Sequence, residues 1–178
     1  MNQIRQSGLL RALLSDAPAA DRADKLNLYG WMIGNWEMDY TYHLTDGSKR
    51  TGTGSIHSGW ALQGRAIQDV WRIPGPNPDG PDDPARSLMY GTTLRVYDPG
   101  IDAWHIVWTD PVKQYYSRQI GRRRGDDIVQ EGIDADGSSV RWTFTDMKPD
   151  AFHWIGERSN DGGKSWRTEV DFFVRRAV

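Results

Sequence analysis

The sequence contains no cysteine, which excludes disulfides, thiolate metal sites and cysteine nucleophiles. It also lacks any apolar run near the roughly 20 residues that a membrane-spanning helix needs. Neither sign of charge is in marked excess, because the formal net charge is -2 at pH 7. This balance gives no electrostatic case for binding nucleic acid or an anionic membrane. We therefore expect no nucleic-acid partner and no membrane partner.

Motifs that mark common enzyme classes are missing as well. The sequence has no nucleophile elbow, phosphate-binding loop, dinucleotide fingerprint or zinc motif. Its histidines do not show the i, i+2 or i, i+4 pairing that is typical of metal sites. They are His43, His57, His105 and His153. The sequence therefore predicts no metal ion and no cofactor.

Aromatic side chains, by contrast, are abundant. The chain has nine Trp and seven Tyr beside only four Phe. Trp and Tyr combine a large apolar surface with a polar tip, so they suit both the core of a barrel and a ligand pocket. We expect most of them to be core residues.

Residues 34–44 give the clearest secondary-structure signal. Even-numbered positions from 36 to 44 carry large apolar side chains, and odd-numbered positions from 37 to 43 carry polar ones. This period of two is the mark of a strand that buries one face. The pair Asp46-Gly47 follows at once, and it favours a tight hairpin turn because that turn needs positive φ.

The rest of the chain repeats this plan of strand, tight turn and strand. We predict strands at 34–44, 51–61, 66–73, 91–97, 103–109, 115–121, 127–133, 139–145, 151–158 and 166–175. Their short connections require antiparallel neighbours, and a long twisted sheet removes its edges by closing. The predicted fold is all-β, an up-and-down antiparallel barrel of about ten strands over residues 26–178.

The segment before the barrel, residues 1–25, is expected to hold a short helix and a linker. Apolar residues over 4–14 fall on roughly one side of a helix, and residues 15–25 are rich in Ala and Asp. Arg11 splits the apolar run, which is then too short for a signal peptide. We expect a cytoplasmic protein whose N-terminal helix plugs the barrel end, covers its wall or joins a second copy in a homodimer.

The first predicted strand opens with Gly34-Asn35-Trp36, which resembles the Gly-x-Trp signature of lipocalins. In that family the Trp closes the barrel floor and an Arg from the last strand packs across it. The resemblance thus implies that Arg175 or Arg176 lies over Trp36, although lipocalins have eight strands. The chain from about 27 to 178 is more similar to bacterial lipocalin-like proteins of the calycin superfamily whose function is unassigned. Stretches 91–99, 141–144 and 161–166 carry this likeness, which implies a fold and a pocket but no reaction.

Two loops have distinctive sequences. Residues 74–84 hold five of the nine prolines, and alternating hairpins place them at the barrel mouth. We predict a lid there, with Asp79, Asp82 and Asp83 forming a negative rim; a plain surface loop is the alternative. Residues 159–166 match the Asp-box of sialidase propellers, but a single copy in so short a chain indicates a structural hairpin turn.

Strand parity selects the residues that face the barrel interior. We predict a ligand cavity lined by Tyr40, Tyr42, Trp71, Ile106, Trp108, Trp142, Phe152, Trp154 and Phe172. A barrel of this size encloses room for one ligand. The predicted function is therefore binding of a small apolar or aromatic molecule in that cavity.

Two other functions remain open. A cofactor-independent isomerase, lyase or hydratase would use Asp69, Glu157, His105 or His153, and burial would raise a carboxyl pKa enough for acid–base work. Against this, Asp69 and Glu157 can instead face outward or pair with Arg95, Arg118 or Arg141. Parity puts both histidines outside unless a bulge turns them. The third function is an interaction protein with a solid barrel.

Overall fold

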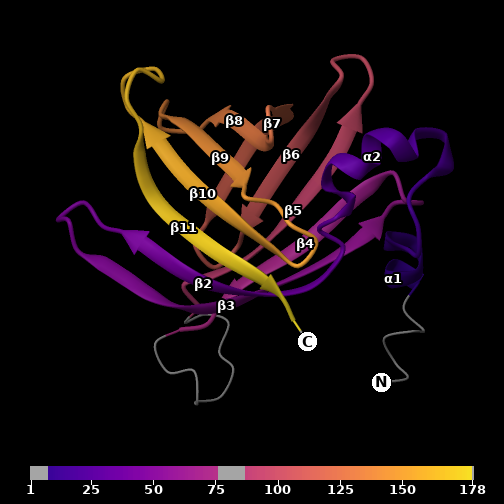
Figure 1. The fold of residues 1–178 in the computed structure, drawn as a ribbon, viewed down its shortest axis with the longest axis horizontal. Helices are drawn as coiled ribbons and strands as arrows, with labels where there is room; N and C mark the ends of the chain where they lie inside the picture. The colour runs from indigo at the N-terminus through magenta and orange to yellow at the C-terminus, as the bar shows by residue number, and fades with distance from the viewer. Residues whose placement is uncertain (1–7, 76–86, 178) are drawn as a thin grey trace.

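Ten antiparallel strands form one closed barrel in the computed structural model, which describes residues 8–75 and 87–177 (Figure 1). The strands are β2 (Gly34–His43), β3 (Lys49–Ala61), β4 (Ala66–Ile73), β5 (Met89–Asp98), β6 (Ala103–Asp110), β7 (Tyr115–Arg124), β8 (Asp127–Ile133), β9 (Ser139–Thr145), β10 (Ala151–Ser159) and β11 (Arg167–Arg176). All ten predicted strands are confirmed. No helix among the described residues is long and apolar enough to cross a membrane.

The barrel closes where its first strand, β2, pairs with its last, β11, from Trp36 opposite Arg176 to Tyr42 opposite Val170. On its other side β2 pairs with β3, from Gly34 opposite Ser58 to His43 opposite Lys49. The second half of β3 pairs with β4, as far as Ala61 opposite Ala66. The first half of β3 therefore continues beyond β4, and the β2–β3 hairpin extends from the mouth (Figure 1).

The segment before the barrel differs from the expected helix and linker. Helix α1 (Gly8–Leu13) has no buried residue, and β1 (Leu14–Ser15) pairs within the sheet with the last two residues of β3. The expected linker over 15–25 is wrong, because a 3-10 turn (Ala20–Arg22) leads into helix α2 (Ala23–Gly30). The short helix was missed because its apolar residues run on into the strand-like stretch up to Ile33.

Helix α2 closes the end of the barrel opposite the β2–β3 hairpin (Figure 1). Leu26 and Tyr29, three residues apart and so on one helical face, are both fully buried. The Tyr29 hydroxyl donates to Gln130 Oε1 at 3.2 Å, and its ring meets the edge of Trp104 at 4.9 Å. Burial raises the pKa of Tyr29 well above its ordinary value. This end of the barrel is therefore a packed floor.

An arginine of the last strand completes the floor. The Arg176 guanidinium lies 4.1 Å from the centre of the Trp36 ring, so the predicted contact is confirmed. It donates to the carbonyls of Ile33, Trp31 and Pro149 at 3.0, 2.9 and 2.9 Å. The planar guanidinium spreads its donors over these three carbonyls while it stacks on the indole, a geometry that the compact ammonium of a lysine does not reproduce.

The expected hairpin turn at 159–166 is present as well. Asp161 accepts hydrogen bonds from the backbone N–H groups of Lys164 and Ser165 at 3.0 and 2.9 Å. Gly162 and Gly163 have φ of 73° and 86°, which only glycine adopts easily. Hydrogen bonds, first among them that from the Ser165 hydroxyl, hold the pKa of Asp161 well below its ordinary value. The Asp-box therefore serves here as a turn.

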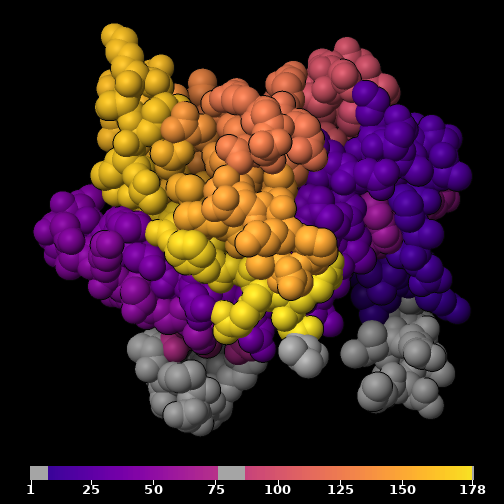
Figure 2. All heavy atoms as spheres, viewed as in Figure 1, coloured from indigo at the N-terminus to yellow at the C-terminus, as the bar shows by residue number. Residues whose placement is uncertain are grey.

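The strands make a continuous wall around the interior. In the space-filling view, atoms of the C-terminal strands and of the β2–β3 hairpin cover the side that faces the reader (Figure 2). A molecule therefore reaches the interior through the ends of the barrel, and α2 covers one of the two ends.

We expect Arg176→Lys to lower the free energy of unfolding by about 1–2 kcal/mol, because it loses charge-assisted bonds to three carbonyls. Arg175→Lys is the matched control, since Arg175 is half exposed and pairs on the outer wall with Asp39. Urea unfolding followed by tryptophan fluorescence measures both. Equal midpoints for the two variants would show that the Arg176 contacts do not stabilise the floor.

Candidate functional site

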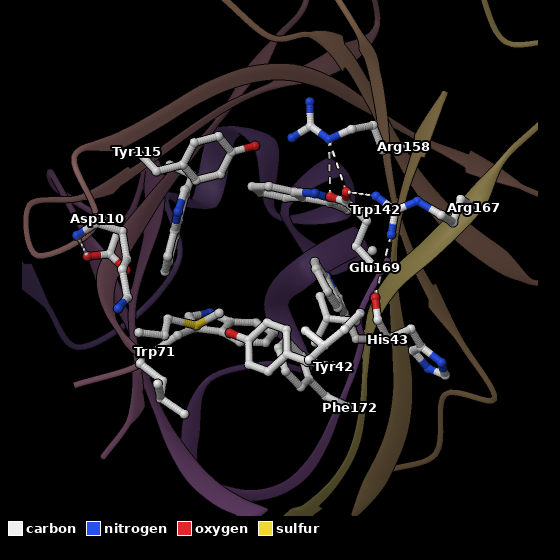
Figure 3. A pocket seen from close by; sticks show the side chains of 18 of the residues that line it. Tyr42, His43, Trp71, Asp110, Tyr115, Trp142, Arg158, Arg167, Glu169 and Phe172 are labelled. Carbon is white, nitrogen blue, oxygen red and sulfur yellow. Dashed lines mark hydrogen bonds and ion pairs between the residues drawn. The ribbon is translucent and has the colours of Figure 1, made fainter. Parts of the chain in front are cut away.

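A cavity of about 660 Å³ occupies the mouth half of the barrel. Rings from strands all around the barrel surround its open centre (Figure 3). The aromatic residues that line it are Tyr42, Trp71, Trp108, Tyr115, Trp142, Trp154 and Phe172. The alternative of a solid barrel is thus excluded, and the interior has two layers, a packed floor and a hollow mouth.

The aromatic rings contact one another around the cavity. The Trp154 ring centre lies 4.9 Å from that of Phe172, 5.6 Å from Trp142 and 5.7 Å from Trp71. Trp142 in turn meets the edge of Trp108 at 6.4 Å. Offset and edge contacts at these distances are favourable, and each ring limits the rotamers of its neighbours. The cavity therefore has a wall of fixed shape.

Six of the nine residues predicted to line the cavity do so: Tyr42, Trp71, Trp108, Trp142, Trp154 and Phe172. The placement of the other three, Tyr40, Ile106 and Phe152, was wrong, since they are buried but do not border the cavity. Phe152, for example, packs in the floor at 5.2 Å from Trp36. Alternation shows which face of a strand points inward, but not the height at which the interior becomes hollow.

One side of the mouth is polar. Arg158 donates to both oxygens of Glu169 at 3.2 Å and to Asp134 at 2.8 Å. Arg167 also donates to Glu169, at 2.6 Å, and Tyr115 donates to Asp134 at 2.9 Å. Figure 3 shows the two arginines on either side of Glu169 at the cavity edge. Opposite charges thus neutralise one another along this side.

The sequence analysis missed this polar cluster. Arg158 shares the parity of Trp154, so alternation alone could have placed it inside. Glu169 has the opposite parity from Phe172, and it reaches the mouth because a bulge shifts the register between Gly156 and Glu157. A bulge turns side chains from one face to the other, and no turn residue in β11 announces this one.

Asp110 also borders the cavity, yet its carboxylate is occupied by the backbone. It accepts hydrogen bonds from the N–H groups of Tyr90, Val112 and Lys113 at 3.1, 2.9 and 3.0 Å. These bonds fix the β6–β7 turn and the start of β5. Asp110 therefore has a structural role at the rim.

The acid–base candidate Asp69 lies in a closed ion pair beneath the cavity. Its carboxylate pairs with Arg95, and both side chains are almost fully buried. It also accepts the N–H of Thr93 at 3.2 Å. Of the pair, Arg95 borders the cavity and Asp69 does not. The expected alternative, a buried pair with Arg95, is therefore the arrangement found.

The other three candidates lie on the outer wall. Glu157 pairs with Arg141 at 2.8 Å, and His105 bonds to Asp98 at 2.9 Å. His153 stacks at 4.1 Å on Phe173, which is 57% exposed. The structure thus brings none of the four candidates together in the cavity. Within residues 8–75 and 87–177, no group of three or more His, Asp or Glu is arranged to hold a metal ion.

The predicted lid falls largely outside the described residues. Residues 76–86, with Asp79, Asp82 and Asp83, are not described, so the lid and its negative rim stay predictions. The residues that follow do border the cavity: Leu88 and Met89 are part of its lining. The Leu88 N–H donates to the Ile73 carbonyl at 3.0 Å, which ties the end of the loop to β4.

We expect stability to fall at alkaline pH partly through Tyr42. Burial, with a smaller effect of Tyr40, raises the pKa of Tyr42 from 10.0 to about 12. Between these values the folded protein keeps a proton that the unfolded chain has lost, so the free energy of unfolding falls as pH rises. Tyr42→Phe should remove about 2 kcal/mol of this fall.

Urea midpoints measured from pH 9 to 12 test the Tyr42 contribution. Tyr116→Phe is the control, because that ring is 49% exposed. If Tyr42→Phe keeps the full alkaline slope of the unchanged protein, the hydroxyl is not buried as described.

Comparisons with known proteins agree with this fold. No family model matches the sequence, and no curated protein matches it. Among solved structures, Rv2717c from M. tuberculosis is similar, with a TM-score of 0.61 and 12% identity over 90% of this chain and 99% of that one. The S-type phycobiliprotein lyase CPES from Guillardia theta is similar too, with a TM-score of 0.56 and 11% identity over the same shares. At these identities the likeness shows a shared lipocalin-like barrel fold.

Proposed function

We propose that this protein binds a small, largely apolar aromatic molecule inside the barrel. The observation that carries the proposal is the cavity of about 660 Å³ bounded by buried aromatic rings. Pockets for small molecules commonly measure about 300–1,000 Å³ and are mostly apolar with a few polar groups. Flat rings already held by their neighbours form a binding wall at little cost in conformational entropy.

The geometry supports binding better than catalysis. Three charged groups at the cavity are engaged: Glu169 with two arginines, Asp110 with three backbone N–H groups, and Arg95 with Asp69. A general acid or base needs a proton-transfer position within hydrogen-bond reach of the substrate. Among the described residues, the four acid–base candidates do not come together at such a position in the cavity. We therefore propose ligand binding in preference to catalysis.

We also propose that the chain belongs to the calycin superfamily. The support is the stacking of Arg176 on Trp36 at 4.1 Å, together with the Gly-x-Trp opening of the first barrel strand. The likeness to a phycobiliprotein lyase supports the fold on which this proposal rests. It carries no argument about a substrate.

Native mass spectrometry of freshly purified protein tests the function directly. We expect a mass above that of the 20.3 kDa chain, and release of an aromatic compound on denaturation. Absorbance of the released compound identifies its ring system. A bare chain that also fails to bind any aromatic dye would contradict the proposal.

We expect Trp108→Ala and Trp142→Ala each to weaken binding of the apolar dye ANS by about 1–3 kcal/mol, since each removes a large ring from the wall. Trp166→Ala is the matched control, because Trp166 packs against Arg141 on the outer wall. Dye titrations on variants with native circular dichroism measure the change. Unchanged affinity in both cavity variants would show that the dye site lies elsewhere.

A further inference from the structure

The cavity tryptophans differ from the others in what their indole N–H groups contact. At the floor, Trp31 and Trp36 donate to the carbonyls of Leu28 and Met32 at 2.9 and 2.8 Å. In the β10–β11 turn, the Trp166 N–H donates to a carbonyl at 3.1 Å. The four tryptophans that line the cavity have no acceptor anywhere in residues 8–75 and 87–177. Tryptophan N–H groups that are buried normally have a partner.

These rings are deeply placed. Trp71, Trp108 and Trp154 are only 4%, 6% and 7% exposed. The indole nitrogen of Trp71 is itself buried and has no partner among the described residues, and a buried donor without an acceptor costs free energy. A second buried donor without a partner is the Nε of Arg95, although the guanidinium of this residue pairs with Asp69.

The acceptors at the cavity are, in contrast, already occupied. Glu169 accepts from Arg158 and Arg167, and Asp110 accepts from three backbone N–H groups. Asp134, behind the wall, accepts from Arg158 and Tyr115. The mouth adds one more donor, because the ammonium of Lys113 has no partner in the described part of the chain. The cavity thus has several hydrogen-bond donors without a partner and few acceptors without one.

We infer that the ligand is a flat aromatic compound bearing hydrogen-bond acceptor oxygens, such as an aromatic carboxylate or ketone, and is neither a plain hydrocarbon nor an amine. This inference rests on the proposed function and names the ligand class. Trp71 and Arg95 lie on the inner face of the neighbouring strands β4 and β5, where Trp71 is opposite Gly91 and Arg95 is opposite Ile67. These two buried donors lie four residues apart along the inner wall, so each can take an acceptor oxygen of the ligand at its own position.

Four naphthalene probes of equal ring size test the inference on the unmodified protein. They are 2-naphthoate, 2-acetylnaphthalene, 2-ethylnaphthalene and 2-(aminomethyl)naphthalene, titrated by quenching of tryptophan fluorescence at pH 7. We expect naphthoate and acetylnaphthalene to bind about tenfold more tightly than ethylnaphthalene, with the amine weakest. Ethylnaphthalene or the amine binding as tightly as the two acceptors overturns the inference and leaves the proposed function standing. No binding of any probe overturns the proposed function as well.

Single replacements identify the donors. Trp71→Phe, Trp108→Phe and Trp154→Phe each keep an aromatic ring and remove one N–H, and Trp166→Phe makes the same change outside the cavity. We expect the preference for acetylnaphthalene over ethylnaphthalene to fall at least about threefold in one or more cavity variants, with the affinity for ethylnaphthalene kept within about twofold. A preference that stays at the unmodified value in every folded cavity variant overturns the inference.

Discussion

Pairing between β2 and β11 is the constraint on which the rest of the structure depends. Seven residue pairs, from Trp36 opposite Arg176 to Tyr42 opposite Val170, join the first and last barrel strands and leave the ten strands without free edges. Closure fixes the strand tilt and with it the width of the interior. Within that fixed width, the size of each inward side chain and its position along the barrel axis determine which part of the interior is filled.

Aromatic residues then divide the interior into two layers with different chemistry. At the floor, Tyr29 and Trp36 pack edge to face with other rings, and their polar atoms form hydrogen bonds within the chain. At the mouth the rings leave a hollow of about 660 Å³, and their N–H groups face no acceptor of the described chain. Aromatic residues thus fill one layer and surround a hollow in the other.

Much of the fold could be predicted because it depends on local periodicity. Alternation and turn residues place all ten strands, and the same count returns the end of the last strand, with Arg175 and Arg176, to Trp36. Helix α2 was missed because it is only eight residues long and owes its stability to burial of Leu26 and Tyr29 in a barrel that local sequence does not show. Tertiary burial of this kind has no signature along the chain.

The candidate site was predicted only in part. Alternation along the strands identifies rings that point inward, such as Trp108 and Trp142. It does not distinguish the hollow layer of the barrel from the packed layer, and for this reason Phe152 was assigned to the cavity when it packs in the floor. Glu169 depends on a bulge, and the pairing of Asp69 with Arg95 depends on register between strands that no local pattern fixes. Sites built across several strands need the register as well as the pattern.

The packed floor has a consequence for how bound molecules exchange. With α2 and Arg176 sealing one end, a molecule in the cavity must leave by the way it came, and the part that went in first comes out last. The ligand that we propose would therefore enter and leave across one rim, on which the β2–β3 and β10–β11 hairpins lie.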